Sequence, residues 1–101
     1  MFTQTELKEF LDYNPYTGKF TWKKNVGKKK LVGKEAGYVN VYVSIRFKKK
    51  LYQAHRLAWF WYYGEWPKED LDHINSNKHD NRIVNLREAT RGKNEANKPL
   101  N

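Results

Sequence analysis

The fold is decided by residues 71–87, which read LDHINSNKHDNRIVNLR. Apolar residues near both ends of this stretch predict two short strands, at 71–74 and 83–87. The polar segment 75–82 between them has no glycine, and its Asn and Asp side chains can order it by hydrogen bonds to the backbone. Thr90 can cap a following helix that places Asn94 and Asn97 on one face. The predicted order is strand, polar loop, strand and helix, which is a ββα unit.

The adjacent residues Asp72 and His73 indicate what chemistry this unit can perform. Neighbours on a strand point to opposite faces, but at a strand end the twist can let both side chains approach one groove. A carboxylate and an Asn from a facing helix offer oxygen ligands, which suit Mg²⁺ or Mn²⁺ better than Zn²⁺. A histidine that does not bind the metal is free to act as a general base near neutral pH. In a basic protein this combination suits hydrolysis of phosphodiesters.

The N-terminal part of the chain predicts a helix and a strand joined by a tight turn. Thr3 and Glu6 fit a capping box that starts a helix at 4–12. Residues 14–18 have the composition of a turn, with proline and glycine at its two ends. Residues 19–23 alternate polar and apolar side chains, as in a half-buried strand.

The middle of the chain predicts a hairpin followed by a buried helix. Residues 37–52 are rich in β-branched and aromatic residues, with one strand over 38–45 and a turn at Lys48 and Lys49. A helix with an apolar face follows at 54–63 and ends at Gly64. We therefore expect an α+β fold: a small antiparallel sheet with a backing helix, followed by the ββα unit.

Charge and composition restrict the class of partner. The formal net charge is +9, of which +8 falls in residues 1–53 and only +1 in residues 54–101. Such an excess predicts a polyanionic partner and makes the basic half a surface for binding nucleic acid. The chain has no cysteine, which excludes disulfide scaffolds, zinc ribbons and thiol nucleophiles. No apolar run approaches the ~18–20 residues that span a bilayer, so we expect a soluble, intracellular protein.

Several short motifs occur in the chain in a defined order. They read YNPYTGKFTW at 13–22, GYV at 37–39, AHRLAW at 54–59, DHINSN at 72–77 and DNRIVNLR at 80–87, with Thr90, Asn94 and Asn97 beyond them. Together they resemble the phage-type HNH endonucleases, which are ββα-metal (His-Me finger) nucleases. That group includes free-standing phage enzymes and intron-encoded homing nickases. The resemblance covers nearly the whole chain and is most specific over 72–94.

The resemblance implies a role for each residue of the motif. Asp72 and Asn94 would bind one divalent ion, His73 would be the general base, and Asn85 would hold the loop so that His73 is oriented. The third letter of the motif is thus Asn rather than His, which favours Mg²⁺ or Mn²⁺ over Zn²⁺. The zinc-knuckle cysteines frequent in the family are absent, so no structural zinc is expected.

Other polar and aromatic residues have more ordinary interpretations. His55 is expected to be a satisfied structural histidine and His79 to be solvated. Asn81 and Arg82 are expected to brace the loop, and Arg82 to reach a phosphate, whereas Asn97 can simply pack. The aromatic residues of the 54–63 helix are expected to lie mostly in the core rather than to stack on bases. They are Trp59, Trp61, Tyr62 and Tyr63.

The sequence thus predicts a double-stranded DNA endonuclease, in which residues 1–66 bind DNA and residues 67–101 cut it as part of one compact unit. We expect it to nick one strand per site, as a monomer or weak dimer in the cytoplasm (that of the host if it is phage-encoded), without membrane contact. A non-catalytic DNA-binding module and an RNA-directed protein remain the alternatives. Basic residues in loops and on the hairpin are expected to contact phosphates. These are Lys28, Lys29, Lys30, Arg46, Lys48, Lys49, Lys50 and Arg82.

Overall fold

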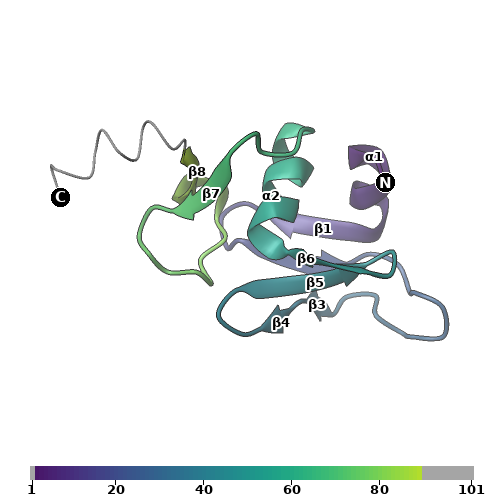
Figure 1. The fold of residues 1–101 in the computed structure, drawn as a ribbon. Helices are drawn as coiled ribbons and strands as arrows, with labels where there is room; N and C mark the ends of the chain where they lie inside the picture. The colour runs from purple at the N-terminus through teal and green to yellow at the C-terminus, as the bar shows by residue number, and fades with distance from the viewer. Residues whose placement is uncertain (1, 90–101) are drawn as a thin grey trace, which may run out of the picture.

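Two short helices and three small antiparallel sheets make up residues 2–89, the part of the chain that the computed structural model describes (Figure 1). The predicted α+β class is confirmed. The closing helix expected after Thr90, with Asn94 and Asn97, lies outside the described residues.

The first sheet follows directly from the N-terminal helix. Helix α1 (Gln4–Phe10) begins at the predicted capping box, in which Thr3 Oγ1 accepts from Glu6 N at 3.1 Å and Thr3 N donates to Glu6 Oε1 at 3.2 Å. It ends at Phe10 because the next residues are already extended as β1 (Leu11–Asn14). Strand β2 (Lys19–Trp22) pairs with β1 on one side and with β3 (Glu35–Ala36) on the other.

The second sheet contains the predicted hairpin, with one correction. The expected single strand over 38–45 is wrong: β4 (Tyr38–Val39) and β5 (Val43–Phe47) are separated by a turn in which Asn40 N donates to Tyr42 O. Strand β6 (Lys50–Gln53) pairs with β5, and Phe47 lies opposite Lys50. The turn at Lys48 and Lys49 is therefore confirmed.

Helix α2 (Ala54–Tyr63) supplies much of the hydrophobic core and ends at Gly64, as predicted. Its Leu57 and Ala58 are fully buried, and its Phe60 stacks on Trp66 at 4.3 Å between ring centroids. The expectation that its aromatic residues lie mostly in the core is wrong for Tyr62 and Tyr63, which are 46% and 53% exposed because they lie on its outer side. The core of the described residues joins α2 to α1, to the first two sheets and to the segment 83–86 through the following buried side chains. They are Phe2, Leu7, Leu11, Tyr13, Phe20, Trp22, Ala36, Ile45, Phe47, Ala54, Leu57, Ala58, Phe60, Ile83 and Leu86.

The third sheet is a separate hairpin of β7 (Asp70–His73) and β8 (Leu86–Ala89) at one end of the molecule (Figure 1). The expected strand over 83–87 is wrong in its first half, where residues Ile83–Asn85 form a 3-10 turn, η1. The chain bends there because Asn85 N donates to Arg82 O, so pairing with β7 starts only at Leu86. Within residues 2–89, neither helix has the length and apolar character needed to cross a bilayer.

Candidate active site

His73 lies at the carboxyl end of β7, just before the polar loop 74–82. Its side chain is buried, with only 6% of the residue exposed. The ring nitrogen Nε2 is 2.8 Å from Oδ1 of Asn81, which is itself only 2% exposed. Because an amide oxygen carries no hydrogen, Nε2 must be the donor in this bond. The neutral ring then carries its lone pair on Nδ1, which has no hydrogen-bond partner among residues 2–89.

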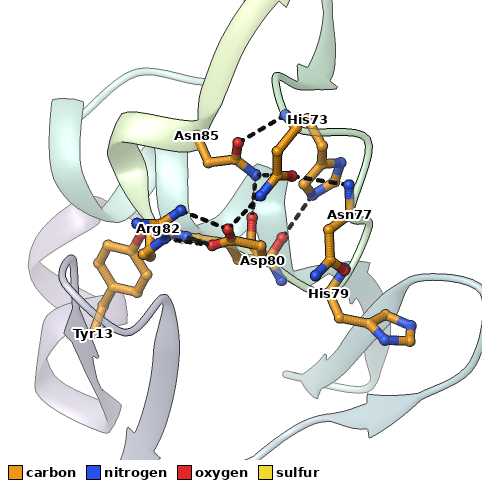
Figure 2. A network of polar contacts seen from close by, with 9 residues as sticks. Tyr13, His73, Asn77, His79, Asp80, Arg82 and Asn85 are labelled. Atoms are coloured by element: carbon orange, nitrogen blue, oxygen red, sulfur yellow. Dashed lines mark hydrogen bonds and ion pairs between the residues drawn. The ribbon is translucent and has the colours of Figure 1, made fainter.

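Asn85 closes the loop that begins after His73 (Figure 2). Its Oδ1 accepts from Asn75 N at 3.0 Å, and its Nδ2 donates to Asn75 Oδ1 at 2.9 Å and to Asp80 O at 2.8 Å. One buried side chain thus joins the start and the end of the loop to η1. This arrangement matches the loop-holding role that the resemblance implies for Asn85.

Asp80 and Arg82 form a bidentate ion pair that also stabilises the same loop. Arg82 donates from Nε to Oδ1 of Asp80 at 2.8 Å and from Nη2 to Oδ2 at 2.7 Å. The Arg82 guanidinium, and then an amide hydrogen bond from Asn75, lower the pKa of Asp80 to about 2. Both described contacts of the Arg82 guanidinium are made with Asp80. This agrees better with the prediction that Arg82 stabilises the loop than with the prediction that it contacts a phosphate.

The N-terminal turn before β2 supports this loop from outside. The Tyr13 hydroxyl donates to the backbone oxygen of Asn81, the residue that holds His73. Gly18 has φ +76°, and a Cβ placed there would lie 2.4 Å from both Arg82 N and Asn81 C. Only glycine allows this approach of the two backbones. Neither residue was among the predicted site residues, although the turn composition at 14–18 and the motif around it marked the segment.

Asp72 directly precedes His73 on β7. Its carboxylate is half-exposed, and its Oδ2 accepts from Nη2 of Arg87 at 3.0 Å, across the pair that the two residues form in the β7–β8 ladder. Its Oδ1 has no hydrogen-bond partner among residues 2–89, so one hard oxygen remains available to a cation. No group of three or more His, Asp or Glu side chains that could hold a metal occurs in the described part of the chain. The second predicted ligand, Asn94, lies outside it.

A comparison with known protein families also points to this loop. Residues 52–96 match the family model of HNH endonucleases. This segment is of the HNH nuclease type. The match begins in β6 and therefore includes α2 as well as the β7–β8 hairpin. No curated protein and no solved structure matches the chain.

His55 is the nearest aromatic neighbour of the HNH histidine among the described residues, and it corrects one expectation. Its ring meets that of His73 edge-on at 4.8 Å between centroids, and Tyr42 packs against both rings at 5.5 and 6.3 Å. His55 is 5% exposed, and its Nδ1 has no partner in residues 2–89, so it is not the satisfied histidine that the sequence suggested. Burial, and then the proximity of His73 and Arg56, lower the pKa of His55 to about 4. At neutral pH His55 is therefore an uncharged ring packed against His73 in the HNH segment.

His79 is exposed, as expected, but it is not merely solvated. Its Nε2 lies 2.6 Å from the backbone oxygen of Asn40, which joins the HNH loop to the turn between β4 and β5. The loop is thus held by Tyr13 from the first sheet and by His79 from the second.

The basic residues predicted to bind DNA, Arg82 apart, gather on two segments at the end of the molecule away from the HNH loop (Figure 1). Lys28, Lys29 and Lys30 lie in the exposed loop between β2 and β3. Arg46, Lys48, Lys49 and Lys50 lie on the β5–β6 hairpin. Lys48 Nζ is bound to Oε2 of Glu6 at 2.7 Å, whereas the other six form no ion pair within residues 2–89.

Proposed function

We propose that the chain is a metal-dependent endonuclease that hydrolyses phosphodiester bonds of double-stranded DNA and nicks one strand per active site. The proposal is carried by one observation, the buried His73 whose Nε2 is engaged by Asn81. A histidine fixed in this way leaves one defined nitrogen, Nδ1, without a protein partner, and that nitrogen is suited to remove a proton from water. The HNH family match supports a nuclease acting on DNA.

In the proposed mechanism, His73 Nδ1 takes a proton from a water molecule, and the oxygen of that water attacks the phosphorus. The bond from phosphorus to the 3′ oxygen breaks, and the departing oxygen takes up a proton from a water molecule, which leaves a 5′ phosphate and a 3′ hydroxyl. Asn81 keeps Nε2 protonated and prevents the ring from turning while Nδ1 accepts the proton. Asn85, through Asn75 and Asp80, keeps the loop in the conformation that places Asn81.

HNH nucleases generally use a divalent metal ion. We propose that Asp72 and Asn94 hold one Mg²⁺ or Mn²⁺, with no structural zinc. The free Oδ1 of Asp72 fits such an ion, because hard cations prefer carboxylate oxygens. When bound, the ion would neutralise negative charge on the phosphorus centre and on the departing oxygen.

We further propose that residues 1–66 bind the duplex and residues 67–101 cut it. The exposed cations at 28–30 and on the β5–β6 hairpin support this division, because they provide phosphate contacts away from the cutting loop. The contacts made by Tyr13 and His79 keep the two parts in one unit.

The nuclease proposal is tested with supercoiled plasmid in Mg²⁺ or Mn²⁺, with and without a chelator. The wild type should produce open circles only when metal is present. His73→Ala should abolish nicking and keep its affinity for duplex DNA, because it removes the base and no phosphate contact. Val84→Ala, which shortens a side chain of the same segment that is 72% exposed, is the control and should nick within a few-fold of the wild type.

The outcome also decides between the two classes of function. If the wild-type chain binds DNA but leaves the plasmid supercoiled with every metal tried, the chain is a DNA-binding module that retains an HNH fold. A His73→Ala variant that nicks at the wild-type rate would remove His73 from the role of base.

A further inference from the structure

A groove lies between the β5–β6 hairpin and the segment 22–38. It has a volume of about 510 Å³. Its walls come from parts of the chain that are distant in the sequence, namely Trp22, Val26, Lys29, Leu31, Glu35, Gly37, Tyr38, Ile45, Arg46, Lys48 and Lys49. The groove thus unites members of both lysine clusters around one hollow.

The rim of the groove is strongly cationic. Lys29, Arg46, Lys48 and Lys49 line it against the single carboxylate of Glu35. Glu35 faces the cation Lys19 at 3.6 Å, which offsets its charge. Such a rim attracts the phosphates of a nucleic acid strand.

The interior of the groove is apolar and aromatic. Trp22 is nearly buried, whereas Tyr38 is 58% exposed, and Leu31 and Ile45 complete the apolar lining. Cations combined with an exposed aromatic ring in a concave surface are suited to a strand whose bases stack on protein. In a duplex the bases are already stacked inside, so only a base that has left the helix can stack on Tyr38.

The size of the groove agrees with this distinction. Its volume falls in the range of about 300–1,000 Å³ that is usual for clefts that take small ligands. One or two unpaired nucleotides fit such a space, whereas a duplex can only lie across its rim.

The hairpin tip carries backbone strain at the same place. Lys48 and Lys49 have φ +50° and +68°, in the left-handed region that Asn and Gly adopt most easily in a tight hairpin turn. Strain of this kind is concentrated at ligand-binding sites, because the side chains there are kept for function. Two lysines at these positions are costly for the fold and useful for binding an anion.

We propose that this groove binds an unpaired segment of DNA, so that the preferred substrate is a duplex with an adjoining single strand. The inference rests on the proposed function for the identity of the ligand as DNA. The groove extends from the hairpin tip to Gly37 and Tyr38, and Asn40, two residues further on, is bound by His79 of the HNH loop. A junction can therefore present its duplex to the loop and its free strand to the groove.

The test measures binding of a fluorescein-labelled 12-nucleotide thymidine strand by the full chain, in a chelator so that no cleavage occurs. Tyr38→Ala should weaken binding by about 5- to 150-fold, the usual effect of losing one stacked base. Tyr38→Phe should bind like the wild type because it keeps the ring. Tyr63→Ala, which removes a tyrosine of similar exposure outside the groove, is the matched control and should also bind like the wild type.

Lys49→Gly provides a second variant that does not depend on Tyr38→Ala folding. It removes a cation from the rim and relaxes the left-handed backbone, so its Tm should not fall while its affinity for the thymidine strand does. Wild-type binding by both Tyr38→Ala and Lys49→Gly overturns the proposal. So does a Tyr38→Ala variant that loses affinity for a 12-base-pair duplex by the same factor as for the strand, or tighter binding of a uridine RNA strand.

Because binding is measured without hydrolysis, the two proposals can fail separately. If the chain nicks plasmid but has no preference for the unpaired strand, the nuclease proposal stands and the proposal about the groove fails. If the chain binds the strand through Tyr38 but never nicks plasmid, the proposal about the groove stands and the nuclease proposal fails.

Discussion

At the scale of single residues, Asn81 determines how His73 can work. A histidine at a strand end could turn its ring or carry its proton on either nitrogen. The amide oxygen of Asn81 at 2.8 Å removes both freedoms, since it accepts only from Nε2–H. In the proposed reaction only Nδ1 of His73 can therefore accept the proton, and Nε2 cannot.

Replacing Asn81 tests this positioning role. Asn81→Leu should lower kcat of nicking by about 10- to 100-fold, the usual loss when the hydrogen-bonding partner of a functional histidine is removed. Its affinity for duplex DNA should not change, because Asn81 is buried. Asn81→Asp keeps an acceptor oxygen and should recover most of the rate in steady-state kinetics. Equal rates for Asn81→Leu and the wild type would show that His73 does not need this bond.

The sequence alone could identify His73 but not its partner. The loop offers Asn75, Asn77 and Asn81, all polar and all close along the chain. Which of them lies against His73 depends on how Asn85 folds the loop back, and that contact spans 5 to 10 residues. A single sequence carries no sign of such a through-space choice.

At the scale of secondary-structure elements, turns were predicted well and strand limits less well. The turn at Lys48 and Lys49, the capping box at Thr3 and the end of α2 at Gly64 all depend on local chemistry, which the sequence displays directly. The segment 83–85 has strand-like apolar residues, yet it forms η1 because Asn85 binds backbone groups of the loop. Local propensity is overridden there by tertiary hydrogen bonds.

The turn before β2 offers a test of an element contact. Gly18→Ala should destabilise the protein by about 2–5 kcal/mol, since left-handed strain costs ~1–2 kcal/mol and overpacking ~1–3 kcal/mol. Gly33→Ala is the matched control: its φ is +85°, but nothing lies within 4 Å of the added Cβ. It should cost only the strain, ~1–2 kcal/mol. Denaturant unfolding of both variants gives the difference, and equal losses would contradict the close approach of Gly18 to the loop.

At the scale of the whole molecule, the charge asymmetry of the sequence becomes a spatial one. The cations of residues 28–30 and of the β5–β6 hairpin lie at the end of the molecule opposite the HNH loop (Figure 1). The cations proposed to hold DNA and the loop proposed to cut it are therefore on different parts of the molecule. The sequence predicted the basic half, but only the fold could bring Lys29 next to Arg46 and Lys49 around one groove.

The salt dependence of duplex binding tests this surface. Replacing Lys49 and Lys50 together with Ala should reduce the slope of log K against log salt by up to ~0.9 for each lost phosphate contact. Lys48→Ala should have a smaller effect, because Lys48 is already paired with Glu6. Lys24→Ala, which removes an ion-paired lysine outside the hairpin, is the control. An unchanged slope in the double variant would mean that these side chains are only solvated charge.

The contacts that Tyr13 and Gly18 make with the HNH loop limit how far the HNH segment can be moved to another protein. A fragment starting at Tyr52 would carry every residue that matches the HNH family, yet it would lack the hydroxyl that holds Asn81 and the glycine that seats Arg82. Grafting that fragment onto another DNA-binding protein would therefore transfer the motif without its support. For protein engineering, the smallest transplantable unit begins at the N-terminal helix, 48 residues before the segment that matches the family.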